Sequence, residues 1–310
     1  MSGTRHCQTF AGLPTRDLDL LEGATVAILG ASEASPYKLG APSHSAHAPQ
    51  TLRAASAGFA EQLWQYDFDL GAVFLDKEGT SRGVVDCGDV ETTPDDPEGN
   101  RARITAAVRR ILIAGAVPVV LGGDDSVPIP VFQAYEGRGP LTVVQIDAHA
   151  DWGDVIKGNP FGYGSTMRRA SEMAWINGMV QVGMRGLGSG SPDQIADARR
   201  WGSRLVTAPA FRQHGVEQVL KHIPAGADCL VTIDCDGLDP SIMPAVGMPT
   251  PGGLLYQDVL DLLHGIVATA RVIGFCLVEF VPDKDPFGLA ALTAARIVGV
   301  SAGLMRAPSS

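Results

Sequence analysis

Apolar runs that lead into glycine or aspartate recur along the chain. They are continuous rather than alternating, which is typical of strands in a parallel sheet that is covered on both faces. The runs span residues 24–30, 116–125, 141–151, 229–240 and 271–280. We therefore expect these five segments to be strands of one parallel sheet.

Between these runs the apolar positions follow a helical spacing. The two stripes consist of Ile104, Val108, Ile111 and Leu112, and of Val259, Leu262, Leu263, Ile266 and Val267. Alternating strands and helices predict one doubly wound domain over residues 1–310, a three-layer α/β/α arrangement with a central, mostly parallel sheet. Residues 30–50 and 89–100 have the composition of long loops, and such loops at strand ends often carry function.

Acidic residues collect at the carboxyl ends of the predicted strands, where open parallel sheets bind ligands. Asp147, His149 and Asp151 occupy alternate positions, so on an extended chain their side chains share one face. Asp234 and Asp236 repeat this spacing. Gathering these carboxylates costs a large repulsion and desolvation energy unless divalent cations are present. Because five or six ligands exceed what one catalytic ion uses, the sequence predicts two metal ions.

For three further acidic residues, a purely structural role is an alternative to a role in the metal site. An aspartate that follows a strand commonly caps a helix or forms a turn. This role fits Asp124, Asp154 and Asp239 when each is considered alone, and it stays open beside a role in the metal site.

Composition and charge narrow the classes of function. The formal charge is −10, and no run of lysine and arginine suggests a nucleic-acid partner. The apolar run at 111–121 is short and broken by glycine and proline, and the first ten residues lack the apolar core of a signal peptide, so we expect no membrane span and a cytoplasmic location. The five cysteines form no CxxC pair, which argues against a disulfide framework or a zinc ribbon.

Several short motifs together resemble a known family. GGDDS, DAHAD, GSTMRRA, VGMRG, TIDCDGLDP, TPGG and VEFVP are similar, in this order, to the signature blocks of the ureohydrolase (arginase/agmatinase) family, over about residues 24–305. The resemblance implies the arginase-type α/β/α fold and a binuclear manganese or nickel centre. It also implies hydrolysis of a guanidino group to urea and an amine, and assembly as a trimer or hexamer.

The resemblance further implies a role for each site residue. Glu279 would hold the guanidinium of the substrate by a charge-assisted pair, and Asp236 would pass a proton to the amine that leaves. Two divalent ions lower the pKa of a shared water, so that a hydroxide attacks the guanidinium carbon. The implied ligands are Asp147 and Asp234 as bridges, Asp125 and Asp151 on one ion, and His149 and Asp236 on the other.

The chain departs from the family pattern at three positions. The family motif GGDHS has a histidine ligand where this chain has Asp125, which keeps a ligand but adds a negative charge. A second family histidine, assigned to proton transfer or substrate contact, is replaced by Tyr163, which can donate a hydrogen bond but is a poor proton carrier near pH 7. Gly186 stands where arginases have an acidic residue, so agmatine-like compounds, alkylguanidines or biguanides fit better than arginine.

Alternatives follow from these departures. His44 and His47 lie in the long first loop, where either could replace the missing imidazole or simply be solvated. The chain could also be a subunit of a heteromeric, metformin-hydrolase-type enzyme, including a catalytically silent partner of an active paralogue. A deacetylase-like enzyme with one zinc ion shares this architecture, but the second acidic motif and Glu279 favour the binuclear reading.

Overall fold

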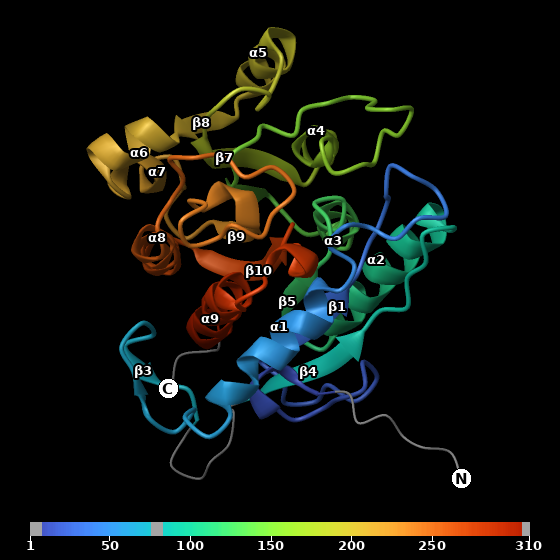
Figure 1. The fold of residues 1–310 in the computed structure, drawn as a ribbon, viewed down its shortest axis with the longest axis vertical. Helices are drawn as coiled ribbons and strands as arrows, with labels where there is room; N and C mark the ends of the chain where they lie inside the picture. Colours follow the sequence, from blue (N-terminus) through green and yellow to red (C-terminus); the bar gives the residue numbers. More distant parts are fainter. Residues whose placement is uncertain (1–7, 76–82, 306–310) are drawn as a thin grey trace.

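The computed structural model describes residues 8–75 and 83–305, and its centre is an eight-stranded sheet (Figure 1). Every neighbouring pair of strands in this sheet is parallel. In spatial order the strands are β4 (Val84–Asp89), β1 (Val26–Ala31), β5 (Val117–Gly122), β10 (Arg271–Val278), β9 (Asp228–Asp234), β6 (Leu141–Ile146), β7 (Ile176–Met184) and β8 (Arg204–Thr207). A separate antiparallel pair consists of β2 (Tyr66–Asp67) and β3 (Ala72–Val73).

Helices cover both faces of the sheet, which confirms the predicted three layers (Figure 1). Buried side chains of α1, α6, α7, α8 and α9 form one apolar core with the sheet, and those of α2, α3, α4 and α5 form the other. The helices are α1 (Ala48–Ser56), α2 (Pro97–Ile113), α3 (Pro128–Gln133), α4 (Thr166–Ser171), α5 (Pro192–Trp201), α6 (Ala208–His214), α7 (Glu217–Leu220), α8 (Tyr256–Thr269) and α9 (Leu289–Met305).

All five predicted strands are present, but most of them end earlier than the apolar runs indicated. In particular, β6 ends at Ile146, so Asp147, His149 and Asp151 lie in the following loop rather than on an extended strand. The prediction that these three side chains share one face of an extended strand was therefore wrong. Asp151 has a φ of 51°, a left-handed backbone conformation that a strand cannot contain.

Three strands of the central sheet were missing from the sequence prediction, namely β4, β7 and β8, as was the separate pair β2 and β3. Asp86 and Asp89 interrupt the apolar pattern of β4, and Asn177 and Gln181 interrupt that of β7. The short β8 lies at the edge of the sheet, where little burial is needed. Polar residues thus concealed strands whose position in the sheet comes from tertiary pairing.

Both predicted helical stripes lie on helices, α2 and α8. The region 89–100 is only partly a loop, because α2 begins at Pro97 and the Asp96 side chain caps it by accepting the N–H of Gly99. The long α9 was not predicted. Most of its own side chains are small or aliphatic and are buried, on several sides of the helix. The sequence therefore shows no one-sided apolar stripe.

Three further expectations concern the first long loop, the cysteines and membrane-spanning helices. Between β1 and α1 the chain is irregular over residues 32–47, within the predicted loop 30–50. Cys87, Cys229, Cys235 and Cys276 have free thiols, and Cys7 lies outside the described residues. Within residues 8–75 and 83–305, no helix has the length and apolar character needed to cross a lipid bilayer.

Candidate metal and guanidino site

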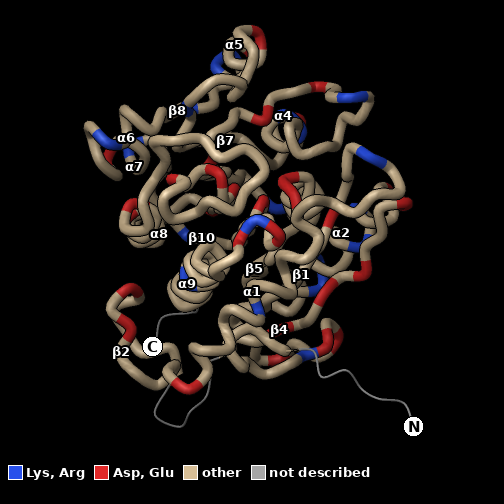
Figure 2. The backbone as a smooth tube through the Cα atoms, in the orientation of Figure 1, with Lys and Arg blue, Asp and Glu red and all other residues tan. Residues whose placement is uncertain are grey.

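Four adjacent strands at the centre of the sheet bring the acidic residues together. The strands β5, β10, β9 and β6 are neighbours in space, and β10 and β9 lie between β5 and β6 although both come much later in the sequence. Ile233 pairs with Ile146 on one side and with Leu277 on the other, so three strand ends are level. In Figure 2 several of the red Asp and Glu segments lie in the middle of the molecule, between the labels β7 and β10.

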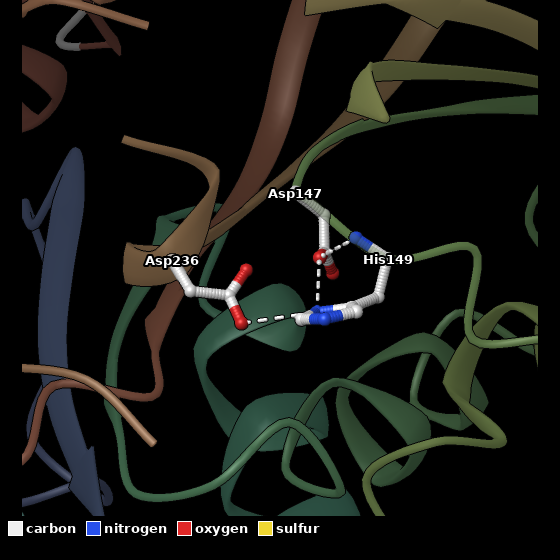
Figure 3. A group of neighbouring side chains, drawn as sticks. All are labelled: Asp147, His149 and Asp236. Carbon is white, nitrogen blue, oxygen red and sulfur yellow. Dashed lines mark hydrogen bonds and ion pairs between the residues drawn. The ribbon is translucent and has the colours of Figure 1, made fainter. Parts of the chain in front are cut away.

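One group of ligand-type side chains consists of Asp147, His149 and Asp236, shown in Figure 3. The Nδ1 atom of His149 lies 3.0 Å from Oδ2 of Asp236 and 3.4 Å from Oδ1 of Asp147. The backbone N–H of His149 also donates to Oδ1 of Asp147, at 2.5 Å. An imidazole and two carboxylates within 4.8 Å of one another form a donor set that divalent metals accept.

A second group consists of Asp125, Asp147 and Asp151, and it shares Asp147 with the first. Both carboxylate oxygens of Asp125, together with Nε2 of His149, are buried and have no hydrogen-bond partner among residues 8–75 and 83–305. Buried polar atoms normally have a partner, and an unmet carboxylate is especially costly. The donor set and these unmatched atoms therefore fit two cations that share one carboxylate.

Asp234 belongs to neither group, although it lies close to them. Its Oδ1 accepts the N–H of Asp236 at 2.7 Å, which fixes the short turn that follows β9. Burial raises its pKa well above the ordinary value, and the charges of Asp236, Glu279 and Asp125 add to this rise. The predicted bridging role of Asp234 stays a prediction.

Burial and mutual repulsion disfavour the charged forms of the clustered carboxylates. Burial is the largest cause in each case, and it raises the pKa of Asp125, Asp147 and Asp151 above the ordinary value. Asp151 adds to the rise at both Asp125 and Asp147 through its charge. Bound cations would remove this penalty, because they favour the charged form of each ligand.

Two buried glutamines, on β6 and β7, support the acidic loop through hydrogen bonds. The sequence analysis missed both of them. Gln145 on β6 donates through Nε2 to Asp147 at 2.7 Å and to Asp151 at 2.8 Å. Gln181 on β7 in turn donates to Oε1 of Gln145 at 2.6 Å and to the carbonyl oxygen of Ala150 at 2.8 Å. An amide within an otherwise apolar strand, two residues before an aspartate, was the available signal.

Glu279 lies directly after β10 and faces the acidic cluster. Its Oε1 accepts the backbone N–H of Asp125 at 2.9 Å, and its φ is 64°. A non-glycine residue with such a φ is uncommon and is often part of a functional site. Its Oε2 lies 2.5 Å from Nε2 of His44, while burial raises the pKa of Glu279 and His44 opposes that rise.

Tyr163 lies beside His44 at the wall of a cavity of about 520 Å³, a size that suits small ligands. The rings of Tyr163 and His44 meet edge to face at a centroid distance of 5.5 Å. The rings of Tyr163 and Tyr37 also pack together, at a centroid distance of 4.2 Å. Burial raises the pKa of Tyr163 further above its ordinary value of 10, so its hydroxyl is neutral near pH 7 and can donate a hydrogen bond.

The three aspartates for which a cap or turn role stayed open all form hydrogen bonds or ion pairs. Asp239 accepts the backbone N–H groups of Ser241, Gly252 and Gly253, and its bonds to Ser241 are the largest cause that lowers its pKa to about 2. Asp124 accepts from the N–H and the hydroxyl of Ser126. Asp154 pairs with Arg169.

Two more residues near the site are accounted for by their contacts. Trp152 lines the cavity and is also packed, since its Nε1 donates to Gln181 at 2.9 Å. Arg185 donates to the carbonyl oxygens of Asp236, Gly237 and Leu238, so it fixes the loop that carries Asp236. His47 is exposed and does not line the cavity.

Comparison with known proteins places the chain in a family. Residues 24–302 match the model of the arginase family. Guanidinopropionase of Pseudomonas aeruginosa is 34% identical over 221 residues, 69% of each chain, and the mitochondrial agmatinase of Gallus gallus is 30% identical over 256 residues, 81% of this chain and 72% of that protein. The solved structure of proclavaminate amidino hydrolase from Streptomyces clavuligerus has a TM-score of 0.81 at 28% identity and covers 96% of both chains. The chain therefore belongs to the arginase family, as the motifs indicated.

Proposed function

We propose that this protein hydrolyses a small guanidino compound to urea and an amine at a centre of two divalent metal ions. The observation that carries the proposal is the pair of ligand groups that share Asp147, with the carboxylate of Glu279 beside them. The similarity to guanidinopropionase and agmatinase supports a guanidino substrate. The cavity of about 520 Å³ suits a molecule of that size.

The ligand groups indicate which residues would hold the ions. One ion would bind between Asp147, His149 and Asp236, and the other between Asp125, Asp147 and Asp151, with Asp234 as a further ligand. Manganese and nickel are the candidates. Two such ions would make hydroxide available from water near neutral pH.

The remaining steps use side chains of this chain. Glu279 would hold the planar guanidinium through a charge-assisted hydrogen bond, which orients its carbon toward the acidic cluster. Tyr163 would donate a hydrogen bond from the cavity wall beside His44, and Asp236 would carry a proton from the water. The oxygen of the water bonds to the guanidino carbon, the carbon–nitrogen bond breaks, and the nitrogen leaves as a protonated amine.

The cavity wall favours some guanidino compounds over others. Apart from Glu279, the clustered aspartates and the two histidines His44 and His149, the charged side chains among the described lining residues are Lys157 and Lys284. Lys284 is anchored there, because its Nζ donates to the carbonyl oxygen of Val246 at 2.8 Å. A second ammonium group on the substrate, as in agmatine, would meet these like charges, so we favour a neutral or anionic tail.

The test is a substrate panel with metal reconstitution. Purified protein is loaded with manganese or nickel, and its metal content per chain is measured. Urea release is assayed from guanidines of equal length with ammonium, neutral or carboxylate ends, and release of urea or guanylurea is assayed from biguanides. We expect about two ions per chain and urea from at least one neutral or anionic compound. Two bound ions with no urea from any compound would contradict the proposal.

Two variants sharpen this test. Glu279→Gln removes the charge that pairs with the guanidinium, so kcat/KM should fall about 10- to 100-fold, equivalent to about 1.5–3 kcal/mol, while metal content is kept. Asp154→Asn is the matched control, because Asp154 is a surface residue that pairs with Arg169 outside the cavity. It should leave both metal content and urea release unchanged.

The second candidate is a subunit of a heteromeric, metformin-hydrolase-type enzyme. Asp125 and Tyr163, which replace two histidines of the family pattern, are the residues that favour it. A silent subunit would bind no ions alone and gain activity only with a paralogue. Metal content and particle mass in solution distinguish this case from a homotrimer or homohexamer of active chains, and fractionation of cells tests the expected cytoplasmic location.

A further inference from the structure

His44 reaches the proposed guanidinium subsite from a loop that is remote in sequence. It lies in the irregular segment before α1, 235 residues away from Glu279, and its Nε2 is 2.5 Å from Oε2 of that carboxylate. The His44 side chain is 34% exposed and lines the cavity, whereas that of Glu279 is 9% exposed. The imidazole thus lies between solvent and a buried carboxylate.

The loop holds His44 in this position through its own contacts. The backbone N–H of Ser43 donates to Oε2 of Glu33 at 2.8 Å, and Glu33 is 3% exposed. The N–H of Ala46 then donates to the carbonyl oxygen of Ser43 at 3.1 Å, so His44 lies inside a hydrogen-bonded turn. A side chain on an anchored turn is suited to a defined role.

The reaction needs a proton donor, and Tyr163 is poorly suited to be one. When the carbon–nitrogen bond breaks, the electron pair goes to nitrogen, and the amine requires a proton. Burial raises the pKa of Tyr163, which keeps its proton tightly bound. Beside that ring, at a centroid distance of 5.5 Å, lies the imidazole of His44.

We propose that His44 is a catalytic residue that donates the proton on Nε2 to the nitrogen of the departing amine. This inference rests on the proposed function, in which Glu279 holds the guanidinium. Two groups that bind one carboxylate must lie next to each other, so a guanidinium on Glu279 is within reach of His44. The imidazolium loses one proton to nitrogen as the bond breaks, and its exposed edge regains a proton from water.

The charges around His44 favour the protonated form. The hydrogen bond to Glu279 is the largest cause that raises the pKa of His44, and the charge of Asp124 acts in the same direction. Burial and the charge of Lys284 oppose the rise, and the net change is upward. Tyr163, the other titratable group in contact, stays neutral.

The main experiment compares His44→Asn with His47→Asn in the metal-loaded protein. The substrates are an alkylguanidine and an alkoxyguanidine of equal length, whose leaving amines differ strongly in basicity. For His44→Asn we expect kcat on the alkylguanidine to fall about 100- to 1,000-fold, with a much smaller loss on the alkoxyguanidine, because a weakly basic amine needs less help from an acid. His47 lies in the same loop and is exposed, so His47→Asn should match the parent protein on both substrates.

Four further readouts separate proton donation from a structural role. The fall in kcat at high pH, where the donor loses its proton, should disappear in His44→Asn, and added imidazole should restore part of the activity of His44→Ala. Metal content should stay at the parent value. In the metal-free protein, NMR titration should give His44 a pKa above the ordinary value of a histidine, and Glu279→Gln should lower it.

Each contrary result has a distinct meaning. Equal losses on both substrates, or an unchanged pH profile, would overturn the donor role while leaving the proposed function intact. A lower KM with unchanged kcat in His44→Asn would show that His44 merely occupies the empty subsite, which also overturns the proposal. If the metal-loaded parent protein releases no urea from any guanidino compound, the proposed function and this inference both fail.

Discussion

At the scale of single residues, Gln145 links the buried strand β6 to the acidic cluster. Its one amide nitrogen donates to both Asp147 and Asp151. Asp147 belongs to both ligand groups, and Asp151 belongs to one of them. Hydrogen bonds of this kind around a metal site commonly determine how well the ligands are oriented.

We predict that Gln145→Leu lowers metal affinity by about 10- to 100-fold, since groups that orient metal ligands contribute that much. The leucine fills a similar volume but donates no hydrogen bond, so Asp147 and Asp151 would be less fixed. Metal titration by calorimetry measures the effect. Gln213→Leu is the matched control on an exposed position, and equal affinity in both variants would contradict the role of Gln145.

The sequence revealed the acidic residues of the candidate site but not the side chains that support them. Asp147, His149 and Asp236 were recognisable because charged residues at the end of an apolar run need a special explanation. The contact of His44 with Glu279 joins positions 235 residues apart, and no local pattern encodes such a contact. Spacing alone also left His44 and His47 equivalent, whereas the contact with Glu279 and the cavity lining distinguish them.

At the scale of elements, a buried ion pair attaches α1 to the edge strand β4. Arg53 is 5% exposed and contacts Asp86 through Nε at 2.8 Å and through Nη2 at 3.0 Å. Asp86 also accepts the backbone N–H of Phe10, and Arg53 donates to the carbonyl oxygen of Gly88. A bidentate pair of this kind satisfies most of its polar atoms within the protein.

We predict that Arg53→Met destabilises the fold by about 3–5 kcal/mol, because it leaves the buried carboxylate of Asp86 without a counter-ion. The double variant Arg53→Met, Asp86→Leu should recover much of this loss. Chemical denaturation of the parent protein, both single variants and the double variant gives the coupling energy. Additive losses would show that the two charges do not depend on each other.

Elements with a regular pattern were predictable, and those defined by tertiary contacts were not. The stripes on α2 and α8 appear in the sequence because each helix has one face toward the sheet. By contrast, α9 packs on several sides, and β7 carries Gln181 because that side chain binds Gln145 rather than solvent. Gln181, one of the polar residues that concealed β7, thus supports the candidate site through Gln145.

At the scale of the whole molecule, clustered acids make the stability of the metal-free protein depend on pH. The folded state raises the pKa of Asp125, Asp147, Asp151 and Asp234 above ordinary values, so it holds protons that the unfolded chain releases. This stabilisation is complete below the unfolded pKa and is lost as pH rises through the folded pKa. The raised pKa of His44 acts in the same direction, and the lowered pKa of Asp239 acts below this range.

We therefore predict that the metal-free protein becomes less stable from pH 5 to pH 8, by about 1.4 kcal/mol per pH unit for each proton that the folded state holds in excess. Manganese should reverse the trend, since its binding requires the charged ligands. Thermal unfolding with a chelator or with manganese across this range measures both effects. Asp125→Asn should flatten the metal-free profile, and a metal-free stability that rises with pH would contradict the account.

The position of β10 also has a consequence for biosynthesis. This strand is the last of the sheet in sequence, yet it lies between β5 and β9 and carries Glu279 at its end. A nascent chain that has not yet released β10 from the ribosome would have two open strand edges where the middle of the sheet belongs, and such edges invite aggregation. Nor could that chain align the acidic loops on either side of the gap, so cofactor loading should follow the completion of synthesis.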